Sequence, residues 1–370
     1  MGVCASIKWT VLRTRIGGLH ALKALTLATK RPAFADVPVG ILLSGGLDSS
    51  LIVALAVEAG HTQLETFSIG FESAGGEKGD EFHYSDIVAK RFRNKHHQHF
   101  ISNQQLTDAL GDCVRSMSEP MVSHDNIGFF LLSHEVAKHV KVVLSGQGAD
   151  EMFAGYHWFQ NVGYRQVSTV KAAEILGKII RDRTYDEYRD TVATAYQTED
   201  KSKRFLENLC KSNASPFLLD HLLEYESTFA LANGPLERVD NMTMASSLEA
   251  RVPFLDEAVI DVAASMPLNM KLQDEGKYIL KKIGDNMLPR EVVHRPKGYF
   301  PVPALKYMQG PTLKLMQDVL TPDRVKGRGI FNPNTVRGLL AEPEKHLTPS
   351  GGSKLWQLGL LELWLQQQGI

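Results

Sequence analysis

The residues with the clearest chemical potential form a short turn, Ser44-Gly45-Gly46-Leu47-Asp48-Ser49, between an apolar run and a helical pattern. Two glycines let the backbone approach an anion, while the helix amides and the serine hydroxyls can donate hydrogen bonds to it. The turn lacks the lysine of GxxxxGK[ST] and the third glycine of GxGxxG, so it predicts a different phosphate site. The alternative is a plain glycine turn whose Asp48 and Ser49 merely begin a helix.

A second candidate loop, Ser145-Gly146-Gln147-Gly148-Ala149-Asp150-Glu151, also follows an apolar run. Asp48 and Asp150 could together hold Mg²⁺, which prefers carboxylate oxygens together with phosphate and water. Taken alone, the second loop would favour the alternative of an acidic pair that caps a helix.

The elements that must position these loops alternate along the first half of the chain. Apolar, β-prone runs at 37–43, 64–71, 97–101 and 140–144 are separated by helical stretches. This alternation predicts the α/β class, with a parallel sheet flanked by helices, and it places both loops at the carboxyl ends of strands, where they should meet. After about Gly155 the pattern becomes mainly helical, and Leu355 to Trp364 indicates a buried terminal helix.

We therefore expect three segments. Residues 1–36 form an N-terminal segment, interpreted as a remnant linker, and residues 37–310 form the main domain, whose sheet core covers about 37–155. Residues 311–370 are predicted to be a helical extension packed on the same domain.

Composition excludes several classes of protein. Forty-one basic and forty-two acidic side chains give a net charge of −1, which does not favour nucleic acid as a partner. The longest apolar stretch, Leu51 to Val57, is far shorter than the roughly 20 residues that span a membrane. Three scattered cysteines and no clear signal peptide favour the cytoplasm. His96, His97 and His99 are not expected to bind a metal, because neighbouring strand residues point to opposite faces.

The strings SGGLDSS, SGQGADEMFAGY and LEARVPFLD, which begin at residues 44, 145 and 248, together resemble the synthetase domain of asparagine synthetase. That family consists of pyrophosphate-loop ATPases that use ATP and Mg²⁺ to adenylate a carboxylate. The resemblance implies a site residue by residue: Leu42, Leu43 and Ile69 at the adenosine; Ser145 and Gly146 at the nucleotide; Ser44, Gly45, Gly46 and Ser49 at the pyrophosphate; Asp48 and Asp150 at Mg²⁺.

Lys277, in Gly276-Lys277-Tyr278, resembles the family lysine that neutralises the α-phosphate during attack by the carboxylate. Without the other motifs it would be interpreted as a solvated lysine at the start of an amphipathic helix. Glu249 and Arg251 are candidates for catalytic or bracing roles, with a structural ion pair as an equal alternative. Arg295 and Lys297 could close over phosphates or form a solvated basic loop.

Gln147 departs from asparagine synthetases, which usually carry an acidic residue tied to handling the acyl-adenylate and ammonia. With His124 to Phe130 and the C-terminal GSKLWQLGLLELWLQQQGI, it makes the chain resemble enzymes that amidate N-acetylglutaminylglutamine to a compatible solute. The acceptor carboxylate is therefore expected to be that dipeptide, with aspartate as the alternative.

The start of the chain also differs from the family, whose full-length members begin with a glutaminase domain carrying a terminal cysteine. Here position 2 is glycine, and only about forty residues precede the phosphate turn. We expect synthesis from free ammonia, unless a separate glutaminase subunit docks. Two other hypotheses are an inactive nucleotide-binding remnant and, disfavoured by the neutral charge, a tRNA-modifying enzyme.

Overall fold

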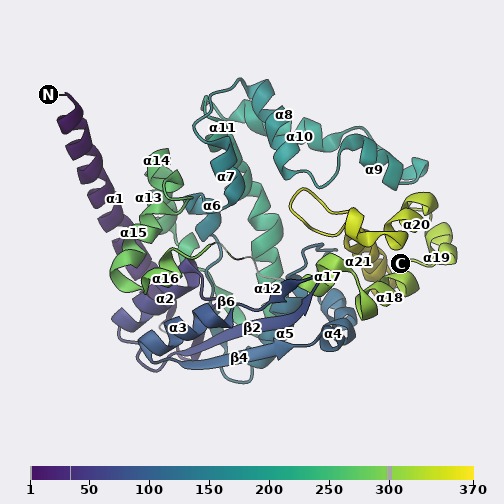
Figure 1. Ribbon diagram of the computed structural model, residues 1–370, viewed down its shortest axis with the longest axis horizontal. Helices are drawn as coiled ribbons and strands as arrows, with labels where there is room; N and C mark the ends of the chain where they lie inside the picture. The colour runs from purple at the N-terminus through teal and green to yellow at the C-terminus, as the bar shows by residue number, and fades with distance from the viewer. Residues whose placement is uncertain (1, 34, 297, 299–301) are drawn as a thin grey trace.

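The centre of the molecule is a largely parallel β-sheet. The computed structural model describes residues 2–33, 35–296, 298 and 302–370. In this part of the chain the strands are β1 (Val39–Leu42), β2 (Glu65–Ala74), β3 (Glu77–Gly79), β4 (Lys95–Ile101), β5 (Val142–Leu144) and β6 (Glu249–Arg251). Parallel pairing gives the order β4-β2-β1-β5-β6, and β3 folds back antiparallel on the end of β2. Figure 1 shows β2 and β4 side by side at the base of the molecule.

Helices cover both faces of this sheet. Those of the first half are α1 (Gly2–Ala33), α2 (Leu47–Glu58), α3 (Phe82–Phe92), α4 (Asn103–Arg115), α5 (Asn126–Val136), α6 (Ala149–Phe153), α7 (His157–Val162) and α8 (Thr169–Ile180). The middle of the chain adds α9 (Tyr185–Thr191), α10 (Lys201–Ser212), α11 (Leu218–Tyr225), α12 (Glu237–Met244), α13 (Glu257–Ser265), α14 (Leu268–Leu272), α15 (Tyr278–Met287) and α16 (Arg290–Val293). The last helices are α17 (Pro303–Tyr307), α18 (Gly310–Val319), α19 (Pro322–Arg328), α20 (Pro333–Ala341) and α21 (Lys354–Gln367). Short 3₁₀ or π turns lie at Thr194–Tyr196, Glu226–Ala230, Ala232–Leu236, Pro253–Leu255 and Pro343–Lys345.

The apolar run at β1 contributes side chains to the buried clusters on both faces of the sheet. Successive side chains point to opposite faces, so Ile41 and Leu43 join one buried cluster and Leu42 joins the other. The first cluster contains residues of α1, α2, α13 and α15, and the second contains residues of α4, α5, α12 and the C-terminal helices. The predicted α/β fold with a parallel sheet flanked by helices is confirmed.

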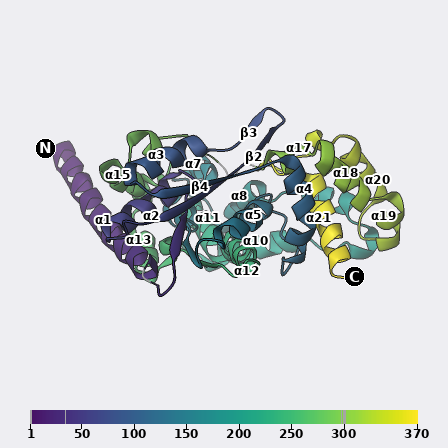
Figure 2. The ribbon, with the colours of Figure 1, turned by 90° about the horizontal axis from the view of Figure 1, so that it is seen from below.

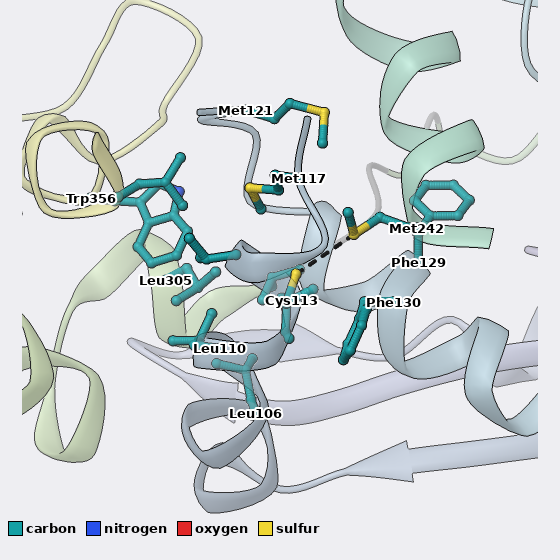
Figure 3. Close-up of a cluster of buried hydrophobic side chains, with 14 of the residues drawn as sticks. Leu106, Leu110, Cys113, Met117, Met121, Phe129, Phe130, Met242, Leu305 and Trp356 are labelled. Atoms are coloured by element: carbon teal, nitrogen blue, oxygen red, sulfur yellow. Dashed lines mark hydrogen bonds between the residues drawn. The ribbon is translucent and has the colours of Figure 1, made fainter. Parts of the chain in front are cut away.

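The second cluster fixes the end of the chain to the sheet layer. Figure 3 shows Cys113 of α4 beside Met242 of α12, with their sulfur atoms 3.6 Å apart, and Trp356 of α21 in the same apolar group. The Trp356 indole donates to the Val122 carbonyl at 3.0 Å. The buried helix predicted over Leu355 to Trp364 is therefore confirmed as the core of α21.

A third buried cluster holds α7, α8, α10 and α11 together as a helical layer beyond the sheet (Figure 1). In Figure 2, α1 lies at one end of the molecule and α18 to α21 at the other, with the sheet between them. No helix in the described part of the chain is both long and apolar enough to cross a membrane.

Two strands were missing from the sequence prediction. Both β3 (Glu-Lys-Gly) and β6 (Glu-Ala-Arg) are three residues long and mostly charged, so neither has an apolar period. Both segments become strands because they pair with a neighbouring strand, β3 with β2 and β6 with β5. The proposed segment boundaries at 36, 155 and 310 stay predictions.

Candidate active site

The two glycine-containing loops meet at the point where the chain changes direction across the sheet. From central β1 the chain runs to β2 and β4 on one side, and it later returns to β5 on the other side. Such switch points leave a crevice at the carboxyl ends of the strands. A side chain at Gly146 would place its Cβ 3.1 Å from the Asp48 Cβ and 3.2 Å from the Ser49 amide, so the two loops are in contact.

The turn after β1 has the geometry of an anion site. Gly45 has a φ of +71°, and a Cβ at this position would lie 2.4 Å from the Ser85 amide, so conformation and space both favour glycine. Helix α2 begins at Leu47 without a side-chain cap at Gly46, which leaves its first amides to an anion or to water. The Ser44 and Ser49 hydroxyl oxygens lie 3.1 Å apart beside them.

A cavity of about 300 Å³ lies between these loops. Most of the residues predicted from the sequence line it: Leu42, Leu43, Ser44, Gly46, Asp48, Ser49, Ile69, Ser145, Gly146, Gln147, Asp150 and Lys277. Gly45 shapes the turn from behind, and Glu249 and Arg251 are outside the lining. The cavity therefore gathers residues of both loops and of a segment far along the chain.

Lys277 bridges the two loops through its side chain. Its Nζ lies 2.5 Å from Asp48 Oδ2 and 2.9 Å from Asp150 Oδ1, and the residue is only 8% exposed. Burial alone would lower the pKa of this ammonium, but the Asp150 and Asp48 carboxylates outweigh it and hold the pKa above its ordinary value. Lys277 is therefore a fixed cation, and its solvated alternative is wrong.

The same arrangement accommodates a divalent cation. Two carboxylates that converge on one positive charge are the oxygen ligands that Mg²⁺ prefers. Gly155 makes room for the Asp150 and Lys277 side chains, because a Cβ there would lie 2.1 Å from both Asp150 Oδ1 and Lys277 Cε. The residues present thus fit a phosphate with its metal ion.

Glu151 adds a buried acidic group behind the site. It accepts a hydrogen bond from the Tyr156 hydroxyl at 2.7 Å. Burial raises the pKa of Glu151; the Tyr156 hydrogen bond opposes this and the neighbouring Asp150 charge adds to it. Nothing in the sequence separates Glu151 from Asp150, because only burial distinguishes the two carboxyl groups.

Glu249 and Arg251 form an ion pair with each other, with Arg251 Nε 2.7 Å from Glu249 Oε1. The ion pair that was the structural alternative for these two residues therefore forms, and their catalytic role stays a prediction. The main chain of Arg251 contributes in another way, because its carbonyl accepts from the Ser145 amide at 2.9 Å. Strand β6 thus positions the second loop.

The lining also includes residues that sequence reasoning left out or left open. The Arg295 side chain is 7% exposed, lies 2.9 Å from Glu81 and places its guanidinium 4.5 Å from the centre of the Tyr84 ring, so its solvated alternative is wrong. Lys297 lies outside the described residues. Glu81 had no signal in the sequence, because an isolated acid before a helix is commonplace.

The comparisons with known proteins agree with this geometry. The family described as asparagine synthase matches residues 20–366. Asparagine synthetase [glutamine-hydrolyzing] 1 of Bacillus subtilis is 29% identical over 363 residues, covering 89% of this chain and 56% of the relative. A putative asparagine synthetase [glutamine-hydrolyzing] of Mycobacterium tuberculosis is 31% identical over 312 residues, covering 74% of this chain and 46% of the relative.

The chain spans about half the length of the curated relatives that it matches. The match of the family runs through both loops, the Lys277 segment and the terminal helix α21. This chain therefore belongs to the asparagine synthase family.

Proposed function

We propose that this protein is an ATP-dependent amide-forming ligase that adenylates a carboxylate, releases pyrophosphate and then transfers ammonia to the acyl group. The observation that carries the proposal is the position of Lys277, buried between Asp48 and Asp150 where the two loops meet. The names of the relatives, which describe glutamine-hydrolysing asparagine synthetases, support the same class of reaction.

Each part of the cavity has a proposed partner on ATP. Ser44, Gly45, Gly46 and Ser49 would hold the pyrophosphate at the start of α2, where amides and hydroxyls can donate. Leu42, Leu43 and Ile69 would contact the adenosine, and Ser145 with Gly146 would contact the nucleotide from the second loop.

Asp48 and Asp150 would hold Mg²⁺, which neutralises phosphate charge when bound. In the first step a carboxylate oxygen of the acceptor attacks the α-phosphorus, and the bond to pyrophosphate breaks. Lys277 then stabilises the negative charge that develops on the α-phosphate oxygens, a type of contribution commonly worth about 3 kcal/mol or more in a dry site. Its burial keeps that charge fixed and poorly screened by water.

In the second step ammonia attacks the acyl carbon and AMP leaves. Gln147 lines the cavity beside both loops, where its amide can hydrogen-bond the acyl-adenylate without adding a charge. The resemblance of Gln147 and the 124–130 segment to enzymes that amidate N-acetylglutaminylglutamine favours an acceptor other than aspartate. We therefore propose the N-acetylglutaminylglutamine carboxylate, with Asp125 and Phe129 of the 124–130 segment at the same cavity.

The test measures pyrophosphate release from ATP and Mg²⁺ with ammonium, comparing the dipeptide with aspartate. We expect release that depends on the dipeptide and falls at least 100-fold in Lys277→Met, about 3 kcal/mol of lost stabilisation. Lys282→Met is the matched control, because Lys282 lies on α15, the helix that begins directly after Lys277, and its ion-pair contacts to Asp274 and Asp285 are longer, at 4.0 and 3.8 Å.

The outcomes separate the alternatives. Asparagine formation without use of the dipeptide would overturn the proposed acceptor but keep the reaction class. Nucleotide binding without pyrophosphate release with either acceptor would indicate an inactive remnant. Replacing ammonium with glutamine tests the nitrogen donor, and glutamate release by this chain alone would contradict the proposed use of free ammonia.

A further inference from the structure

A second cluster of ligand-type side chains lies at the opposite edge of the sheet from the cavity. Glu65 begins β2, His97 lies on β4, and His139 follows α5. Their ligand atoms all lie within 4.8 Å of one another. On β2, Glu65 is two residues before Phe67 and four before Ile69 of the cavity lining, which corresponds to about 7 and 13 Å along the strand.

The spacing of these atoms suits a metal ion. Glu65 Oε2 lies 2.9 Å from His97 Nε2 and 3.7 Å from His139 Nδ1. Ligands at the usual Zn²⁺ distances in a tetrahedron are about 3.3 Å apart, between these two values. Small side-chain rotations would therefore bring the three atoms around one ion, with a fourth position left to water.

The surroundings hold the trio in place while leaving it accessible. His97 stacks on Phe67 with ring centres 4.8 Å apart, and its ring centre is 4.3 Å from that of His139. The three side chains are 27% to 35% exposed, so a hydrated ion can reach them. Lys95 occupies the other carboxylate oxygen of Glu65 at 3.0 Å, which leaves Oε2 directed toward the imidazoles.

The adjacent histidines of β4 behave as the strand period requires, yet only one of them enters this cluster. His96 faces Thr66 and Ser85 on the other side of the sheet, at 2.9 and 3.2 Å. His97 instead finds Glu65 and His139, which come from other elements. A count of neighbouring histidines could not reveal this set.

We propose that Glu65, His97 and His139 form a binding site for a divalent transition-metal cation of the Zn²⁺ class. Two imidazoles and a carboxylate are ligands that such ions favour, whereas Mg²⁺ and Ca²⁺ prefer sites made only of oxygen. A bound ion would join β2, β4 and the segment after α5, with one coordination position left to water.

The test is equilibrium dialysis with Zn²⁺ in excess Mg²⁺, using the whole chain with Cys4→Ser so that this thiol does not compete. We expect one Zn²⁺ per chain and a higher unfolding temperature in its presence. His139→Gln, a change in an exposed segment that the fold tolerates, should weaken binding about tenfold or more. Co²⁺ in place of Zn²⁺ should give a visible absorption band that the same substitution removes.

Two variants keep the test specific. His83→Gln changes an exposed histidine of α3 and should bind Zn²⁺ as the parent does. Lys95→Gln removes a positive charge that would repel a cation bound at Glu65, while Oε2 stays beside His97, so Zn²⁺ should bind equally or more tightly. The proposal is overturned by absence of saturable binding, by unchanged affinity in His139→Gln, or by weaker binding in Lys95→Gln.

Discussion

Gly155→Ala tests the active-site geometry without removing any functional group. An added Cβ would lie 2.1 Å from Asp150 Oδ1 and from Lys277 Cε, whereas ordinary contact begins at 3.4 Å. Both atoms must therefore retreat by about 1.3 Å, and a misplacement of about 1 Å can cost roughly 100-fold in rate. These atoms belong to flexible side chains, so the backbone fold should persist.

The assay is pyrophosphate release under saturating ATP, Mg²⁺ and acceptor, together with urea unfolding of the same preparation. We expect a rate loss of about 100-fold and a cooperative unfolding transition like that of the parent. Gly327→Ala is the control, because its added Cβ meets nothing within 4 Å on helix α19. A Gly155→Ala enzyme with more than a tenth of the parent rate would refute the assignment of Asp150 and Lys277.

Three further predictions concern stability, measured by urea unfolding. Burial lowers the pKa of Lys271 to about 8, although the Asp220 charge opposes this shift. Below pH 8 the folded protein therefore holds a buried ammonium, which lowers the free energy of unfolding. Lys271→Met should stabilise the protein by up to about 3 kcal/mol at pH 7, and this gain should disappear between pH 8 and 10.5. Burial also lowers the pKa of His124 to about 4. As the pH falls from 6.5 to 4, the unfolded chain therefore binds a proton before the folded protein does. The free energy of unfolding of the parent should fall by up to about 3 kcal/mol over this range, and that of His124→Asn should fall less. Leu110→Ala, in the core beside α21, should cost about 2–5 kcal/mol.

Each stability prediction has its own contradiction. Destabilisation by Lys271→Met at pH 7 would mean that its ammonium is well solvated or paired. If His124→Asn lost as much unfolding free energy as the parent between pH 6.5 and 4, His124 would not be a cause of that loss. Asp108→Ala, an exposed change on the same helix as Leu110, should stay within about 0.5 kcal/mol, and a larger loss there than in Leu110→Ala would contradict the packing argument.

The sequence by itself determined the features that depend on local pattern. An apolar run followed by Ser44-Gly45-Gly46 predicts a strand, a turn and a helix start, because strand period, glycine conformations and helix amides all act within a few residues. Alternation of such units along the chain then predicted the parallel sheet and brought the second loop, with Asp150, to the same edge.

Only the tertiary structure decided which distant side chains meet. Lys277 is 229 residues from Asp48, and its burial between two carboxylates follows from the packing of α15 against α2 and α6, the helices that begin at the two loops. The short strand β6 has no apolar period, and it forms because its backbone pairs with that of β5. Charge, burial and pKa are properties of the assembled surroundings, so a sequence can propose the chemical groups while three-dimensional packing decides their neighbours.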